Sequence, residues 1–183
     1  MDMKVLVVVD MQNDFTSGVL GNKECNEAVL NVVSLINSKE YNKVILTRDT
    51  HDGDTYLSTQ EGKKLPVPHC IKGTEGWQIR REIMEAVEKN YSEKDYVVID
   101  KPTFGSKELA ESLEYIFKKQ QEKLEIHFCG VCTGICVISN VALIKAFLPE
   151  SKVCVVENAC ACVTPESHRT AIEAMKTFQV EIV

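Results

Sequence analysis

Short, uninterrupted runs of branched apolar residues constrain the fold of this chain more than any other feature. The run VLVVVD ends at Asp10 and the run KVILTRD ends at Asp49, and neither shows a regular polar alternation. Strands of this kind suit a parallel sheet that helices cover on both faces. We predict six strands, at Lys4–Asp10, Lys43–Asp49, Tyr96–Lys101, Leu124–Val131, Lys152–Val156 and Gln179–Val183.

Helical periodicity fills the segments between these runs. Val29, Val32 and Ile36 fall on one helix face, and similar stripes lie within 79–87 and 109–117. Thr164 and Pro165 predict the start of another helix, as its N-cap and its first helical residue. The alternation predicts a single three-layer α/β/α domain over residues 1–183. We take the Rossmann-like order 3-2-1-4-5-6 as its strand order.

Composition and charge limit the kinds of binding partner and the cellular compartment that we expect for this protein. The 183 residues include 21 Lys and Arg against 27 Asp and Glu, a net charge of −6, which is the wrong balance for binding a phosphate backbone. No apolar run reaches the length of a signal-sequence core or a membrane span. We therefore expect a cytoplasmic protein that binds neither nucleic acid nor membrane, with its eight cysteines as reduced thiols.

Polar residues follow the predicted strands at one edge of the sheet. Asp10, Asp49 and Lys101 end the first three strands, and the stretch CGVCTGIC closes the fourth. The predicted order places the first and fourth strands side by side at the switch point, where open α/β sheets bind their ligands. We expect the functional site at this edge.

Cys136 is the candidate nucleophile of that site. It lies about three residues into a helix that Thr133 is expected to cap, where the helix dipole favours a thiolate. Asp10 is then placed to accept the thiol proton, Lys101 to stabilise both charges, and backbone N–H groups to face an oxyanion. From spacing alone, the apolar residues around Cys136 favour a buried structural thiol, so both interpretations stay open here.

A second group of residues has the character of a metal site. Asp49 and His51 lie two residues apart, and His69 follows in an irregular segment that is long for a connection in a compact domain. Two imidazoles and a carboxylate suit Zn²⁺, Fe²⁺ or Mn²⁺, with Glu61 as a further candidate ligand. Polar loop residues without a metal are the alternative.

Five motifs, in this order across nearly the whole chain, resemble a known family: VVVDMQNDF, TRDTHD, PHCIKGTEGW, VIDKPTF and GVCTGICV. The chain resembles the isochorismatase-like cysteine hydrolases. Within them, the D-x-H pair, the P-H-C segment and GTEG are most similar to the nicotinamidase (pyrazinamidase) branch. The resemblance implies a catalytic triad of Asp10, Lys101 and Cys136. It also implies a non-proline cis peptide before Cys132, whose N–H would join that of Cys136 in an oxyanion hole.

The same resemblance implies a cofactor and a reaction. Asp49, His51 and His69 would bind one divalent metal ion, with Zn²⁺ expected and Fe²⁺ or Mn²⁺ as alternatives. Phe15 and Phe104 would line the substrate pocket. The reaction would convert nicotinamide to nicotinate and ammonia through a cysteine thioester in NAD salvage, or would act on another small amide or N-carbamoyl compound. Family members often form oligomers, so a homo-oligomer is expected.

A non-enzymatic hypothesis uses the other thiols. Cysteines that would form a metal or redox sensor are Cys129, Cys132, Cys154, Cys160 and Cys162. The pair in CGVC has the spacing of a redox motif, yet Cys129 is predicted within a strand, whereas the first cysteine of a thioredoxin-type motif starts a helix. This placement favours the hydrolase.

Overall fold

The structure is a computed structural model that describes residues 3–120 and 124–183; residues 1–2 and 121–123 of the predicted domain lie outside them. In the described part of the chain, six parallel strands form one sheet in the order β3-β2-β1-β4-β5-β6, which confirms the predicted order. The strands are β1 (Met3–Val9), β2 (Lys43–Asp49), β3 (Tyr96–Lys101), β4 (Leu124–Val131), β5 (Lys152–Ala161) and β6 (Glu181–Ile182).

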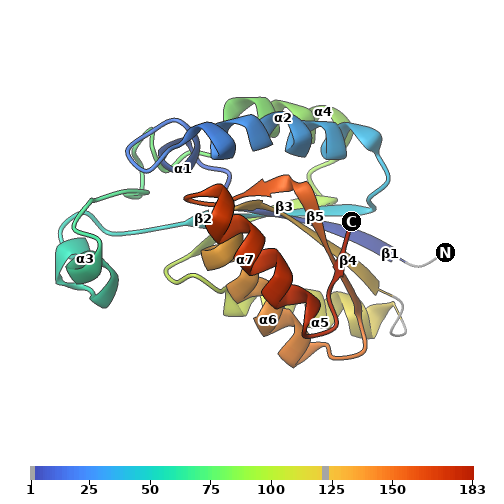
Figure 1. The fold of residues 1–183 in the computed structure, drawn as a ribbon. Helices are drawn as coiled ribbons and strands as arrows, with labels where there is room; N and C mark the ends of the chain where they lie inside the picture. The colour runs from blue at the N-terminus through green and yellow to red at the C-terminus, as the bar shows by residue number, and fades with distance from the viewer. Residues whose placement is uncertain (1–2, 121–123) are drawn as a thin grey trace.

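Helices cover both faces of the sheet, as predicted (Figure 1). The α-helices are α1 (Asn13–Thr16), α2 (Lys23–Ser38), α3 (Gln60–Lys64), α4 (Arg81–Asn90), α5 (Lys107–Lys119), α6 (Ile138–Phe147) and α7 (Pro165–Lys176), with short turns η1 (Tyr56–Ser58) and η2 (Thr133–Val137). Helices α2 and α4 pack on one face, and α5, α6 and α7 on the other. Because both faces are covered, Val5, Leu6 and Val7 of β1 are fully buried. No helix among the described residues has both the length and the apolar character needed to cross a membrane.

Strand β5 is longer than predicted. It was expected to end at Val156, but it pairs again with β4 through Cys160 and Ala161 after a shift of register. The exposed Glu157 and Asn158 lie in the irregular part, and their polarity broke the pattern on which the prediction rested. Strand β1 ends one residue early because Asp10 has a positive φ of 49°, which a strand does not allow.

The predicted cap of the helix that carries Cys136 is wrong. The turn η2 is a π-helical turn, and Cys132, not Thr133, stands at its N-cap position without a side-chain hydrogen bond. Thr133 is fully buried, and its hydroxyl pairs with Nδ1 of His168 on α7 at 2.8 Å. Tertiary packing against α7 thus replaces local capping.

Thr164 caps α7 as predicted, and this predicts a measurable stability effect. Its hydroxyl accepts from Ser167 N at 3.1 Å, and Ser167 Oγ accepts from Thr164 N, which completes a capping box. Thr164→Ala should lower the free energy of unfolding by about 1 kcal/mol, measured by urea denaturation, because the first turn loses this acceptor. Thr170→Ala, at an exposed position inside the same helix, is the control and should be no less stable than wild type.

Candidate active site

A buried lysine joins two buried carboxylates at the carboxyl edge of the sheet. Lys101, at the end of β3, places its Nζ 2.7 Å from Asp10 Oδ2 and 3.7 Å from Asp49 Oδ1. All three side chains are at most 2% exposed. Thr47 on β2 donates to Asp10 Oδ1 at 2.7 Å and so orients that carboxylate. The predicted convergence of the strand ends is therefore present in the structure.

Lys101 and each of the two carboxylates stabilise each other's charged forms. Burial raises the pKa of Asp10 and Lys101 lowers it, and the balance lies above the usual carboxylate range. Burial alone would lower the pKa of Lys101, but Asp10, the Cys136 thiol and Asp49 raise it well above its ordinary value. Lys101 therefore stays charged, and Asp10 is a stronger base than an exposed aspartate.

Cys136 lies beside this pair, but its resting state differs from the expectation. The side chain is 5% exposed, and burial together with the neighbouring Asp10 raises the pKa of the thiol well above its ordinary value, while Lys101 lowers it. The increase in the thiol pKa caused by burial next to a carboxylate outweighs the decrease expected from the helix terminus. The resting group is a neutral thiol, which needs a base to become a nucleophile.

The turn that carries Cys136 is held by its own backbone and by Asn140. The Val131–Cys132 peptide is cis, as the family resemblance implied. The Cys132 carbonyl accepts from the N–H groups of Ile135 and Val137, at 3.0 and 3.1 Å.

Asn140 was missed by sequence reasoning. Its Nδ2 donates to the carbonyls of Cys136, at 2.8 Å, and of Phe104, at 3.0 Å, and so joins η2 to the loop after β3. The Phe104 side chain itself is exposed. The available signal was an asparagine one helical turn after Cys136, in the mostly apolar stretch GICVISNVALIKAF.

Four side chains with metal-binding atoms meet next to Asp49. One donor atom from each of Asp49, His51, Glu61 and His69 lies within 4.8 Å of the others. His51 Nε2 is 2.9 Å from Asp49 Oδ2 and 3.6 Å from Glu61 Oε1, and His69 Nε2 is 3.6 and 3.5 Å from the same two atoms. Glu61 comes from α3, in the irregular segment after β2 (Figure 1).

The chemistry of this cluster fits a divalent metal ion. Val67 O lies 2.8 Å from His69 Nδ1, a contact that leaves Nε2 free to act as a ligand. Asp49 Oδ1 is buried without a hydrogen-bond partner in the described part of the chain. The two histidines lower the pKa of Glu61 to about 2; burial alone would lower the pKa of His51, but Asp49 and Glu61 raise it to about 9. The carboxylates of Asp49 and Glu61 thus favour a positive charge within this cluster.

Aromatic rings border the cluster. The Phe15 ring lies 5.4 Å from the His69 ring, between centroids, so the structure brings this predicted pocket residue to the site. Tyr56 packs against both imidazoles, with centroids 4.8 Å from His51 and 5.2 Å from His69, and donates its hydroxyl to Leu65 O. Sequence reasoning missed Tyr56, since the irregular segment that holds it has no periodicity to read.

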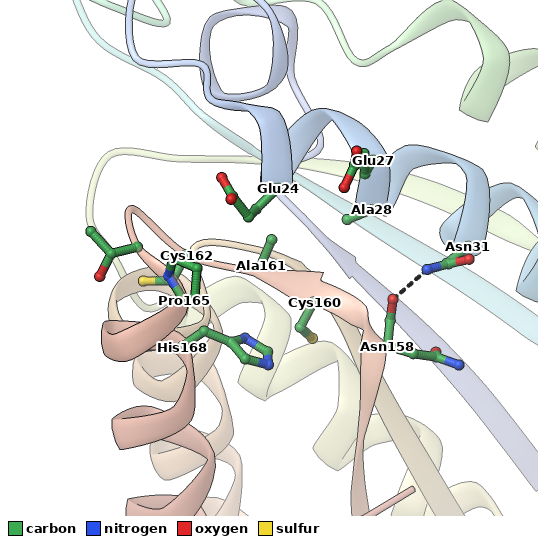
Figure 2. Close-up of a pocket in the computed structure, with 11 residues that line it drawn as sticks. Glu24, Glu27, Ala28, Asn31, Asn158, Cys160, Ala161, Cys162, Pro165 and His168 are labelled. Carbon is green, nitrogen blue, oxygen red and sulfur yellow. Dashed lines mark hydrogen bonds between the residues drawn. The ribbon is translucent and has the colours of Figure 1, made fainter.

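The five cysteines of the sensor hypothesis do not assemble into one centre; of them, in the described part of the chain, only the Cys132 and Cys162 thiols contact each other. Cys129 is buried in β4, and its thiol points to Val7 O. Cys160 and Cys162 border a separate cavity of about 230 Å³ between α2 and the start of α7, and their sulfur atoms point away from each other (Figure 2). Among the described residues, the clusters with metal-binding atoms include only Cys154 of these five cysteines.

Comparison with known proteins agrees with the geometry. The model of the isochorismatase domain family matches residues 4–183. The nicotinamidase/pyrazinamidase of Mycobacterium tuberculosis is 27% identical over 188 residues, covering 99% of this chain and 98% of that protein. The crystal structure of the Bacillus subtilis nicotinamidase/pyrazinamidase superposes with a TM-score of 0.83 at 26% identity, over 99% of both chains.

A further crystal structure bears on the metal cluster. It is that of the Pyrococcus horikoshii pyrazinamidase in complex with zinc, which superposes with a TM-score of 0.73 at 26% identity over 98% of both chains. Because the family model spans nearly the whole sequence and the fold and strand order agree, this chain belongs to the isochorismatase family.

Proposed function

We propose that this amidohydrolase converts nicotinamide to nicotinate and ammonia through a thioester on Cys136. One observation carries the proposal: the buried Cys136 thiol adjoins a buried carboxylate–lysine pair at the edge that also holds the Asp49 cluster. The similarity to proteins named nicotinamidase/pyrazinamidase supports this choice of amide. In that role the enzyme would serve NAD salvage.

In the first step Asp10 accepts the thiol proton of Cys136 while the sulfur forms a bond to the amide carbon. The raised pKa of Asp10 suits a general base, and Lys101 stabilises the negative charge on sulfur. The N–H groups of Cys132 and Cys136 would face the oxyanion that develops on the amide oxygen.

In the second step Asp10 returns the proton to the amide nitrogen, the C–N bond breaks, and ammonia leaves. Water then adds to the thioester carbon and gives a proton to Asp10. The C–S bond breaks as Asp10 passes that proton to the Cys136 sulfur, which releases nicotinic acid and restores the thiol. Lys101 keeps its charge throughout, because its carboxylate neighbours hold its pKa high.

Asp49, His51 and His69 would hold the metal ion, with Glu61 as a fourth ligand. A bound divalent ion supplies Lewis-acid chemistry to groups beside it. We propose Zn²⁺, on the donor set and on the zinc complex of the related pyrazinamidase. Phe15 would pack against the pyridine ring, and Phe104 would close the pocket from the loop that Asn140 holds.

Metal removal is the direct test of this function. Ammonia release from nicotinamide should fall to background after chelation and return when Zn²⁺, Fe²⁺ or Mn²⁺ is added, since the cluster must be occupied by a cation. His69→Ala should not be restored by the same addition. Full turnover by protein shown to be free of metal would contradict the metal assignment. Turnover of pyrazinamide or an N-carbamoyl compound, but not nicotinamide, would keep the hydrolase and replace the substrate.

A further inference from the structure

We propose a second divalent-metal site, at the amino ends of strands β4, β5 and β6. It is formed by Glu125, His127 and Cys154, with Glu181 as the fourth ligand. One donor atom from each of the first three lies within 4.8 Å of the others. Cys154 Sγ is 3.8 Å from Glu181 Oε2. The site is independent of the proposed catalytic function.

Strand register is what brings these residues together. Glu125 and His127 alternate on β4, so both side chains project from the same face. His127 pairs with Cys154 on β5, and Cys154 pairs with Glu181 on β6. All four stand near the amino ends of parallel strands, whereas Asp10 and the catalytic group stand at the carboxyl ends.

His127 is oriented as a metal ligand would be. Its Nε2 lies 2.6 Å from Glu125 Oε1, and its Nδ1 lies 3.1 Å from the Tyr41 hydroxyl. In the metal-free protein Nε2–H donates to Glu125; a metal ion would take the place of that proton, with Nδ1–H then donating to the Tyr41 oxygen. A hydrogen-bonded second nitrogen of this kind is the usual support of a ligating histidine.

A cation entering this group would displace two lysines that now pair with its carboxylates. Lys152 Nζ lies 3.5 Å from Glu125 Oε1 and 3.4 Å from Glu181 Oε2, and Lys4 Nζ lies 3.8 Å from Glu125. Both lysine side chains are about half exposed or a little less, so these ion pairs contribute at most about 1 kcal/mol and are free to open.

The donor set also selects the ion. Imidazole and thiolate donors favour Zn²⁺ or Co²⁺ over Mg²⁺ and Ca²⁺, and the thiol proton of Cys154 passes to solvent on binding. Glu181 is 60% exposed on the side chain, which leaves a route from solvent.

Cobalt substitution isolates this site from the catalytic one. The Asp49 cluster has only nitrogen and oxygen donors, so a thiolate-to-Co²⁺ charge-transfer band would come from a cysteine-containing site and not from that cluster. We expect the band in Co²⁺-loaded wild type and its loss in Cys154→Ser, with one equivalent of bound metal lost as well. Cys160→Ser, on the same strand, and Cys136→Ala should both keep the band.

Two further variants keep the test decisive if Cys154→Ser does not fold. Glu181→Gln changes an exposed carboxylate, and Tyr41→Phe removes the hydroxyl that orients His127. Each should weaken metal binding at this site by about 10-fold or more. Absence of the band in wild type that binds Co²⁺ at the catalytic cluster, or its persistence in Cys154→Ser, would overturn the proposal.

Discussion

Replacing Cys136 by Ala should abolish ammonia release from nicotinamide and leave the protein folded. The variant lacks the sulfur that forms the thioester, and loss of a catalytic nucleophile lowers kcat by about 10⁴-fold or more. Only one buried sulfur atom is removed, so the free energy of unfolding should fall by about 1 kcal/mol. Ammonia release and urea denaturation, measured on the same preparation, check the two expectations.

A second buried cysteine serves as the control. Cys129 is fully buried in β4, where its thiol contacts a backbone carbonyl and not the Asp10–Lys101 pair. Cys129→Ala should therefore keep turnover close to that of wild type at a comparable stability loss. If Cys136→Ala retained turnover, or if both variants lost it equally, the nucleophile assignment would be wrong.

Lys101→Met should remove both activity and a large part of the stability. Asp10 and Asp49 would lose the cation between them, and breaking a buried pair by removing one partner costs about 3–5 kcal/mol. Without Lys101, the pKa of Asp10 rises further, so the folded variant binds more protons than its unfolded chain. Its stability should then fall as the pH rises above the ordinary carboxylate pKa of about 4.

A double variant separates charge balance from catalysis. Adding Asp10→Asn to Lys101→Met removes the carboxylate that lay nearer to Lys101, and an amide at this position still accepts from Thr47 and tolerates the positive φ. Urea denaturation as a function of pH should show recovered stability and a weaker pH dependence. Turnover should stay absent, because no base remains for Cys136. A stable Lys101→Met variant at pH 8 would show that the pair is not what holds this edge together.

Much of the fold was predictable because local patterns and the tertiary structure agree. Apolar runs identified the strands, and the rule that parallel strands end at one edge placed Asp10, Asp49 and Lys101 together. The capping box at Thr164 also depends only on neighbouring residues. The predictions that failed lie where distant contacts decide: β5 continues past Val156 because β4 offers it partners.

The sequence by itself determined the strands, their parallel direction and the residue types that gather at the carboxyl edge, since these depend on periodicity and strand direction. Only the tertiary structure decided that Glu61 lies beside Asp49, His51 and His69 and that Asn140 holds the Cys136 turn, because both contacts join segments with no regular spacing between them. It also decided the protonation of Cys136. Burial beside Asp10 raises the pKa of that thiol, and burial is a property of the packed protein that no local motif contains.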